Sequence, residues 1–325
     1  MAVYLLKAGL ALIGVGLTWL FRPLATRNLS VLKSAPAPDY ATAVSRFQTV
    51  TVGKEGPEIL TSCYSILLEH DRKTERAILF LHGLTSCPKQ FEKLGNHFYE
   101  MGYNVLIPRL PLHGMADRMN GNLTSLTAEV LQTFTEECLN ITRGLGDRVT
   151  IVGLSGGGVL ATWLAQFSPD IEQAVIMSPS LGLYRANTLL NNLITKLMMR
   201  LPNVYNLRTA ENQAVAPPYV QIKNSSHAAA QFFRLGITVF QAARKSGPAC
   251  QRIVVVSNAS DIIVNNRLVK RLVQLWQANS TGQVETFEFE ASQKLPHDII
   301  DPNAKVDHSA LVYPVLLDII TGWET

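Results

Sequence analysis

Short runs of hydrophobic residues alternate with longer amphipathic stretches along most of the chain. Five runs are typical of buried strands, at residues 77–81, 104–108, 148–153, 173–177 and 252–257. The stretches that follow four of them predict helices at residues 88–101, 125–142, 157–167 and 265–278. Hydrophobic runs separated by helices in this way indicate an α/β fold, with a mostly parallel sheet covered by helices on both faces.

The pattern is less regular at both ends of this region. Two extended stretches, near residues 44–52 and 58–68, precede the first buried run. An alternating strand at residues 284–289 and a helix at residues 309–321 close the chain. We therefore expect one α/β domain over residues 43–325.

The alternation is interrupted between about residues 180 and 248. This stretch contains an amphipathic helix at residues 189–199 and a second helix near residues 228–244. Ligands of α/β proteins bind beyond the carboxyl ends of the strands, so we expect the insertion to form a helical lid over a site there. The helix at 189–199 could present a lipid to that site or simply pack against the sheet, and the sequence leaves both readings open.

The first part of the chain is strongly apolar. Residues 2–21 carry one charge, Lys7, and are about as long as the ~20 residues that a helix needs to span a bilayer. Arg22, Arg27 and Lys33 follow, without a convincing small-x-small cleavage site, so the segment at 1–33 is predicted to be an uncleaved N-terminal membrane-anchor helix with a basic flank.

Two other readings of this segment remain. The uninterrupted apolar stretch of residues 8–21 also fits the core of a signal peptide, and the segment could instead be a buried helix of the domain. The basic residues on its two sides are too evenly balanced to predict which side of the membrane the enzyme faces. A short stiff linker at 34–42, which contains Pro36 and Pro38, is expected to connect it to the domain.

Composition excludes several classes of function. The chain has 29 Lys and Arg against 25 Asp and Glu, a net charge of +4, and no basic stripe interleaved with aromatic residues, so nucleic-acid binding is not indicated. Its four cysteines are widely scattered, and no disulfide framework is expected. Since no CxxC or Cys/His cluster occurs, we expect neither a metal nor another cofactor. The oligomeric state is left open.

The strongest chemical signal is Gly153-x-Ser155-x-Gly157, which lies directly between a predicted strand and a predicted helix. A serine at such a tight turn adopts a strained backbone conformation, and glycines on both sides avoid Cβ clashes. The hydroxyl then stands at the amino end of a helix, which favours a developing negative charge. Ser155 is therefore the predicted nucleophile.

A nucleophilic serine of this kind needs two backbone donors for the oxyanion. The residue after the nucleophile, Gly156, supplies one amide. The other is expected from Leu84, because the loop His82-Gly83-Leu84 follows the strand at residues 77–81. We interpret His82 as a residue that orders this loop, and the alternative is that it acts as the catalytic base.

The remaining members of a triad are expected after later strands. Asp261 follows the strand at 252–257, and His297 follows the strand at 284–289, which gives the chain order Ser, Asp, His. His308 is a rival base, at the start of the last helix. The nearby acids are expected to be surface or capping groups: Asp298, Asp301 and Asp307.

Together these motifs resemble the carboxylesterase and monoacylglycerol-lipase-like branch of the α/β-hydrolase superfamily, over roughly residues 76–322 without the insertion. The segments that carry the resemblance are His82-Gly83-Leu84-Thr85, residues 108–114, residues 153–157, Asp261 with Val264, and His297-Asp298. The resemblance implies a Ser155–Asp261–His297 triad and a loop at 108–114 that shapes the acyl pocket. In two places the chain departs from the family: Gly156 stands where Met or Gln is frequent, and Leu112 replaces a glycine before the loop histidine.

The sequence thus predicts a serine hydrolase that cleaves carboxylic esters by two-step acyl transfer. The acyl and alcohol parts of the substrate stay open, with lipid-derived esters such as monoacylglycerols or lysolipids as one candidate class, and the membrane is the expected partner. Cleavage of small amides or peptides is an alternative activity, because related enzymes share these motifs. An inactive binding protein on the same fold is a further alternative, against which the complete set of three residues argues.

Overall fold

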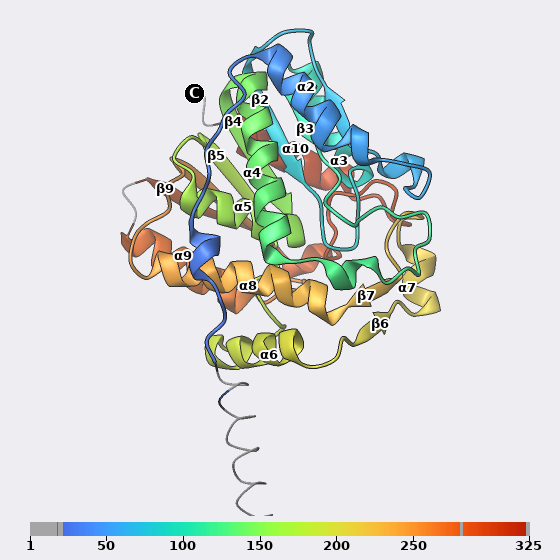
Figure 1. Cartoon of the computed structure of the whole chain (residues 1–325), viewed down its shortest axis with the longest axis vertical. Helices are drawn as coiled ribbons and strands as arrows, with labels where there is room; N and C mark the ends of the chain where they lie inside the picture. Colours follow the sequence, from blue (N-terminus) through green and yellow to red (C-terminus); the bar gives the residue numbers. More distant parts are fainter. Residues whose placement is uncertain (1–17, 19–21, 280–281, 323–325) are drawn as a thin grey trace, which may run out of the picture.

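The computed structural model describes Thr18, residues 22–279 and residues 282–322. Seven strands form one sheet in the order β1-β3-β2-β4-β5-β8-β9 (Figure 1). Only β1 runs antiparallel to its neighbour, while the other pairs are parallel. The strands are β1 (Ile66–Leu68), β2 (Thr74–Leu81), β3 (Asn104–Ile107), β4 (Gly146–Leu154), β5 (Gln173–Met177), β8 (Arg252–Asn258) and β9 (Gln283–Phe289). The predicted α/β class and parallel sheet are confirmed.

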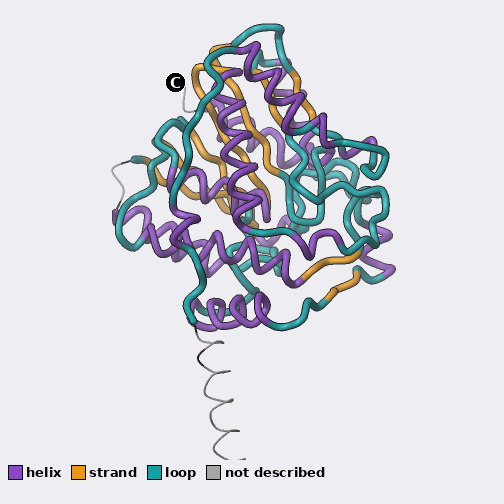
Figure 2. The backbone as a smooth tube through the Cα atoms, viewed as in Figure 1, coloured by secondary structure: helices purple, strands orange, loops and turns teal. Residues whose placement is uncertain are grey.

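Helices cover both faces of the sheet, and Figure 2 shows the strands enclosed between them. One hydrophobic core lies under α2 (Tyr40–Val50), α4, α5, α8 (Ser226–Ala243) and α9, and a second lies under α3 and α10 on the opposite face. The helices that belong to the alternating pattern are α3 (Lys89–Glu100), α4 (Ala128–Leu145), α5 (Gly156–Phe167), α9 (Asn266–Asn279) and α10 (Ser309–Thr321). Each begins within three residues of its predicted start.

The strand register brings the carboxyl ends of the central strands to one edge. Leu81 at the end of β2 pairs with Gly153 near the end of β4, and Leu154 pairs with Met177 of β5. The loops that follow β2 and β4 therefore start next to each other. These loops contain Leu84 and Ser155.

The extended stretch predicted at residues 44–52 is wrong, because α2 (Tyr40–Val50) occupies most of it. Asp39 caps this helix by accepting a hydrogen bond from the amide of Thr42 at 2.7 Å. Ala43 and Phe47, four residues apart, are both buried and belong to the core that includes α4. The side chains thus follow a helical period. In the stretch at 58–68 only β1 is a strand.

The insertion between β5 and β8 contains more structure than its sequence suggested. It holds α6 (Thr188–Arg200), α7 (Ala210–Val215), α8 (Ser226–Ala243) and a two-stranded antiparallel sheet of β6 (Tyr205–Leu207) and β7 (Lys223–Ser225). Most of α8 is buried against the domain, whereas α6 lies outside it at the periphery of the molecule (Figure 1).

The chain between residues 29 and 37 runs along α4 and α5. Trp163 donates a hydrogen bond to the carbonyl of Leu29 at 2.6 Å, and the amide of Ala35 donates to Asn140 at 3.1 Å. The predicted membrane anchor at residues 2–21 lies outside the described residues, apart from Thr18. In the part of the chain that is described, none of the helices is long and apolar enough to cross a bilayer.

Two of the scattered cysteines are joined, contrary to the expectation from their spacing. Cys63, ahead of β1, forms a disulfide with Cys87, which lies just before α3. Cys138 and Cys250 are free and buried. The disulfide ties the loop after β2 to the segment ahead of β1. Sequence spacing could not reveal the pair, because the two cysteines meet only when the sheet has formed.

Candidate active site

Ser155 lies at the tight turn between β4 and α5. Its backbone adopts φ 58° and ψ −112°, a region that residues with a side chain rarely occupy. Two backbone hydrogen bonds hold the turn: the amide of Ser155 donates to Met177 at 3.0 Å, and the amide of Ser180 donates to the carbonyl of Ser155 at 3.1 Å. The rare conformation is thus fixed by the neighbouring strand and the loop after it.

The two glycines of the motif are required by close backbone contacts. A Cβ on Gly153 would lie 2.2 Å from the carbonyl oxygen of Gly157. A Cβ on Gly157 would lie 1.8 Å from the carbonyl oxygen of Leu81, at the end of β2. Both distances are far shorter than any real contact, so only glycine lets α5 start this close to the sheet.

The same turn brings Gly156 next to the loop after β2. A Cβ on Gly156 would lie 2.9 Å from the amide nitrogen of Leu84. The amide of Gly156 is in the first turn of α5, where amides lack a partner within the helix. Among the described residues, the amides of Leu84 and Gly156 donate no hydrogen bond. The structure therefore brings both predicted oxyanion donors together with their amides available.

Asp261 and His297 are joined by a hydrogen bond. Nδ1 of His297 lies 2.6 Å from Oδ2 of Asp261, in the loops after β8 and β9. The other carboxylate oxygen accepts hydrogen bonds from the amides of Ile263 and Val264. Burial alone would raise the pKa of Asp261, but the hydrogen bond and charge of His297 and these two amides lower it below its usual value.

The second ring nitrogen of His297 remains available. Nε2 is buried and has no hydrogen-bond partner among the described residues, Ser155 included. A carboxylate on Nδ1 fixes the tautomer in which Nε2 carries a lone pair. Such a nitrogen can take a proton from a nearby hydroxyl. In enzymes without bound substrate, the hydrogen bond from a catalytic hydroxyl to such a nitrogen is often long, and it tightens only when substrate binds. His308, the rival base, is instead the residue before α10 and does not contact Asp261.

His82 orders the loop after β2 from beneath. It is fully buried, with Nδ1 2.9 Å from the carbonyl of Gly83, while Nε2 accepts a hydrogen bond from the amide of Leu110 at 3.0 Å. Burial, and next the neighbouring His113, lower the pKa of His82 well below its usual value. Both nitrogens are occupied, so His82 holds its loop and has no free nitrogen with which to act as a base.

Two hydrogen bonds that the sequence did not reveal join the loop that contains His297 to the loop after β2. Asp298, beside His297, accepts a hydrogen bond from Nε2 of Gln90 at 2.6 Å. Oε1 of Gln90 in turn accepts the amide of Gly83 at 3.0 Å, next to Leu84. Gln90 is 2% exposed. Through Gln90 at the start of α3, these two hydrogen bonds fix the loop of His297 and the loop after β2 relative to each other.

The expectation of surface acids is wrong for Asp301, which is 3% exposed. Its carboxylate accepts hydrogen bonds from the hydroxyl of Tyr219 at 2.5 Å and from the amide of Asn303 at 2.9 Å. Asp298 is partly buried, and it also accepts the amides of Ile300 and Asp301. Asp307 is an exposed capping group, as expected, and accepts the amide of Ser309.

The described residues contain no group of three or more His, Cys, Asp or Glu side chains that could hold a metal ion. The described groups are a serine at a strained turn, a histidine paired with an aspartate, and two backbone amides without a hydrogen-bond acceptor. Their arrangement suits attack of a hydroxyl on a carbonyl carbon.

Comparison with known proteins decides the family. Residues 78–298 match the model of the alpha/beta hydrolase family, which is more than half of the chain. The chain belongs to this family. The match begins in β2 and ends just beyond His297, so it includes every residue of the arrangement above.

One sequence relative and two solved structures illustrate what this chain is similar to. A thermostable monoacylglycerol lipase from a Bacillus species is 30% identical over 100 residues, which span 29% of this chain and 36% of the relative. A monoacylglycerol lipase from Paleococcus ferrophilus has a TM-score of 0.58 at 16% identity, with 80% of this chain and 98% of that chain covered. A metagenome-derived lipolytic enzyme has a TM-score of 0.60 at 17% identity, over 81% and 99% of the two chains. The structural matches show a shared fold.

The structure explains one departure from the family pattern and locates the other. A Cβ on Gly156 would lie 2.9 Å from the amide nitrogen of Leu84 and 3.2 Å from the ring of Phe232, which is on α8. In this hydrolase, α8 therefore fills the space that a larger side chain would need. Leu112 adopts φ 66°, the conformation for which glycine is usual, and it packs against the core.

The buried acid Asp301 gives a testable pH dependence. Burial, and next the charge of Asp298, raise the pKa of Asp301 to about 6. The native state then holds a proton that the unfolded state releases near pH 4, so this group lowers stability as the pH rises from about 4 to about 6. Relative to wild type, Asp301→Asn should gain about 2–3 kcal/mol of unfolding free energy across that window.

Urea denaturation of both proteins at pH 4 and pH 7 measures this difference. Asp307→Asn, at an exposed residue, serves as the matched control. Its difference in unfolding free energy from wild type should change little in the upper half of the window, because the pKa of Asp307 is lowered. If the unfolding free energies of wild type and Asp301→Asn differed by the same amount at both pH values, the raised pKa of Asp301 would be contradicted.

Proposed function

We propose that this protein is a serine hydrolase that cleaves carboxylic esters, with Ser155 as nucleophile, His297 as base and Asp261 as its orienting acid. The observation that carries the proposal is the 2.6 Å pair of His297 and Asp261, with Nε2 of His297 left unpartnered, in a fold whose Ser155 stands at a strained turn. Leu84 and Gly156 are assigned as the oxyanion donors.

The reaction proceeds in two steps on these groups. Nε2 of His297 takes the proton of Ser155 as its oxygen attacks the ester carbonyl, and the amides of Leu84 and Gly156 stabilise the oxyanion. The imidazolium, stabilised by Asp261, then donates its proton to the leaving alcohol, and an acyl-enzyme remains. Water attacks this ester with His297 again as base, which releases the acid and restores Ser155.

Cleavage of small amides is the alternative activity, since it would use the same groups. Esters are favoured here because the family relatives reported above are described as lipases, and an alcohol is a better leaving group than an amine. A purely binding role is disfavoured, because a strained serine and a buried, unpartnered histidine nitrogen cost stability without contributing to binding.

Replacement of the nucleophile tests the proposal. Ser155→Ala should lower kcat for a short-chain p-nitrophenyl ester by roughly 10⁴ to 10⁶ and leave the urea midpoint within the range of wild type. Ser292→Ala, at an exposed serine in a short turn, is the matched control and should retain full activity. Ester turnover by Ser155→Ala comparable to that of wild type would rule out the assigned nucleophile.

A lipid-derived substrate, such as a monoacylglycerol or a lysolipid, is the second part of the proposal. In α6 the buried side chains are polar, Asn191 and Thr195, whereas Leu189 is 82% exposed and Leu190 is 46% exposed. Core packing therefore does not account for these two leucines. We assign α6 as the part of a lid that meets an apolar substrate phase.

The membrane anchor and the side of the membrane belong to the same proposal. Arg200, at the end of α6, donates a hydrogen bond to the carbonyl of Arg22, the residue that follows the apolar segment 2–21. Anchoring through that segment would hold α6 and its exposed leucines close to a bilayer. The disulfide Cys63–Cys87 favours an oxidising compartment, so we assign the domain to the extracytoplasmic side.

Substrate chain length should control the specificity constant. For monoacylglycerols or p-nitrophenyl esters, kcat/KM should rise with each added methylene, by at most about fourfold if each is fully buried. The paired substitution Leu189→Ser and Leu190→Ser should reduce turnover of long-chain substrates in vesicles and leave that of a soluble acetate ester unchanged. A flat or falling series would exclude lipid esters and still leave ester hydrolysis in place.

Fractionation of cells that express the full chain checks the anchor and the compartment. The protein should remain in carbonate-washed membranes, and deletion of residues 2–21 should release it. Without a reductant, a maleimide reagent added to the denatured protein should modify two cysteines, Cys138 and Cys250, and with one it should modify all four. Release of the full chain by the carbonate wash would contradict the membrane anchor. Four reactive thiols without reduction would contradict the oxidising compartment.

A further inference from the structure

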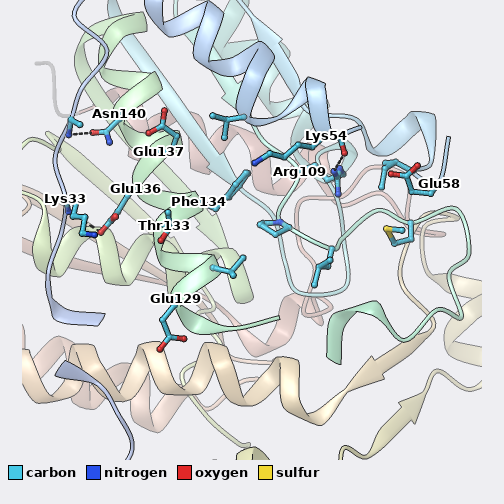
Figure 3. Close-up of a pocket in the computed structure, with 17 residues that line it drawn as sticks. Lys33, Lys54, Glu58, Arg109, Glu129, Thr133, Phe134, Glu136, Glu137 and Asn140 are labelled. Carbon is cyan, nitrogen blue, oxygen red and sulfur yellow. Dashed lines mark hydrogen bonds between the residues drawn. The ribbon is translucent and has the colours of Figure 1, made fainter. Parts of the chain in front are cut away.

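A second cavity lies apart from the catalytic groups, on the face of the molecule formed by α4. Its volume is about 900 Å³, near the upper end of the roughly 300–1,000 Å³ that is usual for ligand pockets. It is enclosed by α4, by segments that precede β1, and by the loop after β3 (Figure 3). None of the proposed catalytic or oxyanion residues lines it. The cavity is therefore not part of the site already described.

The walls of the cavity are mainly apolar. They come from three parts of the chain that lie far apart in the sequence, which makes the cavity a product of the tertiary fold. The apolar lining residues are Val50, Ile59, Pro111, Leu112, Met115, Val130 and Phe134. Val130, in the first turn of α4, is 45% exposed, so apolar surface there is left in contact with water. An apolar chain laid in the cavity would cover this surface.

Two of the three glutamates of α4 that border the cavity lie beside an arginine of the same chain. Glu129 forms a bidentate pair with Arg234, with oxygen to nitrogen distances of 2.6 and 3.0 Å. Glu136 accepts hydrogen bonds from Gln132 and from the amide of Lys33. Glu137 lies 3.8 Å from Arg46. Glu129 and Glu137 are therefore paired with cations, whereas Glu136 is held by neutral donors and keeps its charge.

The positive charges are not all neutralised. Arg109 is held by Glu55 at 3.3 Å and by two backbone carbonyls. Lys54, in contrast, forms no ion pair with the described residues, and Figure 3 shows its side chain reaching across the cavity toward Phe134. The remaining acid, Glu58, lies in that view beyond Arg109. Lys33, at the opposite end of the lining, likewise forms no ion pair with the described residues. The cavity thus combines apolar walls with two lysines, and the ammonium of Lys54 is the one that reaches toward Phe134.

We propose that this cavity binds a long-chain fatty acid, with its carboxylate on the ammonium of Lys54 and its chain over Val130, Leu112 and Phe134. Lys54 is an exposed residue, so a neutral apolar ligand laid over it would remove water from its ammonium without supplying a partner, whereas a carboxylate supplies a charge-assisted hydrogen bond. This ligand site is inferred from the cavity and its charges alone. It therefore goes beyond ester hydrolysis and does not depend on it.

Photolabelling of the full chain in lipid nanodiscs tests the proposal. A photoreactive analogue of palmitic acid with an alkyne tag is bound and crosslinked, and the labelled peptides are mapped by mass spectrometry. Labels are expected on the peptides that contain Val130 and Phe134 or Pro111 to Met115. Excess palmitic acid should remove them, while the uncharged alcohol of the same chain length should compete about tenfold less well.

Matched variants separate the charge from the fold. Lys54→Glu should weaken labelling of the cavity about tenfold, and Lys54→Arg should retain it. Val130→Trp, at an exposed position, should block it by filling the cavity. Lys245→Glu, at an exposed lysine that follows α8 and does not line the cavity, should have no effect.

Three outcomes would overturn the proposal. These are no label in the cavity, equal competition by acid and alcohol, or labelling that Lys54→Glu leaves unchanged. Label confined to peptides around Ser155 would also overturn it, and would place the acid in the catalytic site as a product. Because the readout is binding, loss of esterase activity in Ser155→Ala leaves this test unaffected, so the two proposals fail separately.

Discussion

The backbone of Ser155 is the constraint on which the rest of the site depends. Its positive φ turns the chain sharply enough for α5 to start against the end of β2, where Gly157 leaves no room for a side chain. That contact is also what brings Gly156 to the amide of Leu84. A larger residue at either glycine would push α5 away from the sheet. The serine, its helix and the oxyanion loop would then lose their relative placement.

Much of the fold could be predicted from the sequence, because its central strands are buried on both faces and read as continuous hydrophobic runs. The turn at Ser155 was predictable for a related reason, since its glycines are demanded by local backbone geometry. In contrast, α2 could not be distinguished from a strand. Its few apolar residues fit both periods in a short stretch, and its cap at Asp39 carries the decisive signal.

Features that depend on contacts between distant residues were beyond sequence reasoning. Cys63 and Cys87 meet only once β1 and the loop after β2 are in place. Gln90 and Asp298 are 208 residues apart, yet their hydrogen bond links the two loops that hold the proposed donor and base. Asp301 reads as a surface acid in a polar stretch, and only the tertiary fold reveals that Tyr219 covers it. Side chains that join separate loops leave no local pattern.

One loop connects the proposed active site with the second cavity. The amide of Leu110 donates to His82 beneath the oxyanion loop, and the next two residues, Pro111 and Leu112, line the cavity. His82 and His113 meet edge to face, with ring centroids 5.3 Å apart. The loop is thus held rigidly on its inner side, where the oxyanion donor must stay in place. Its outer side is free to contact an apolar ligand.

The central claim is that His297, oriented by Asp261, activates Ser155. The most direct measurement is the rate at which a fluorophosphonate modifies the full chain, with the adduct located by mass spectrometry. We expect a single adduct on Ser155, a rate lowered by roughly 10³ or more in His297→Gln, and an unchanged rate in His308→Gln. An adduct on another serine, or equal rates for wild type and His297→Gln, would contradict this claim.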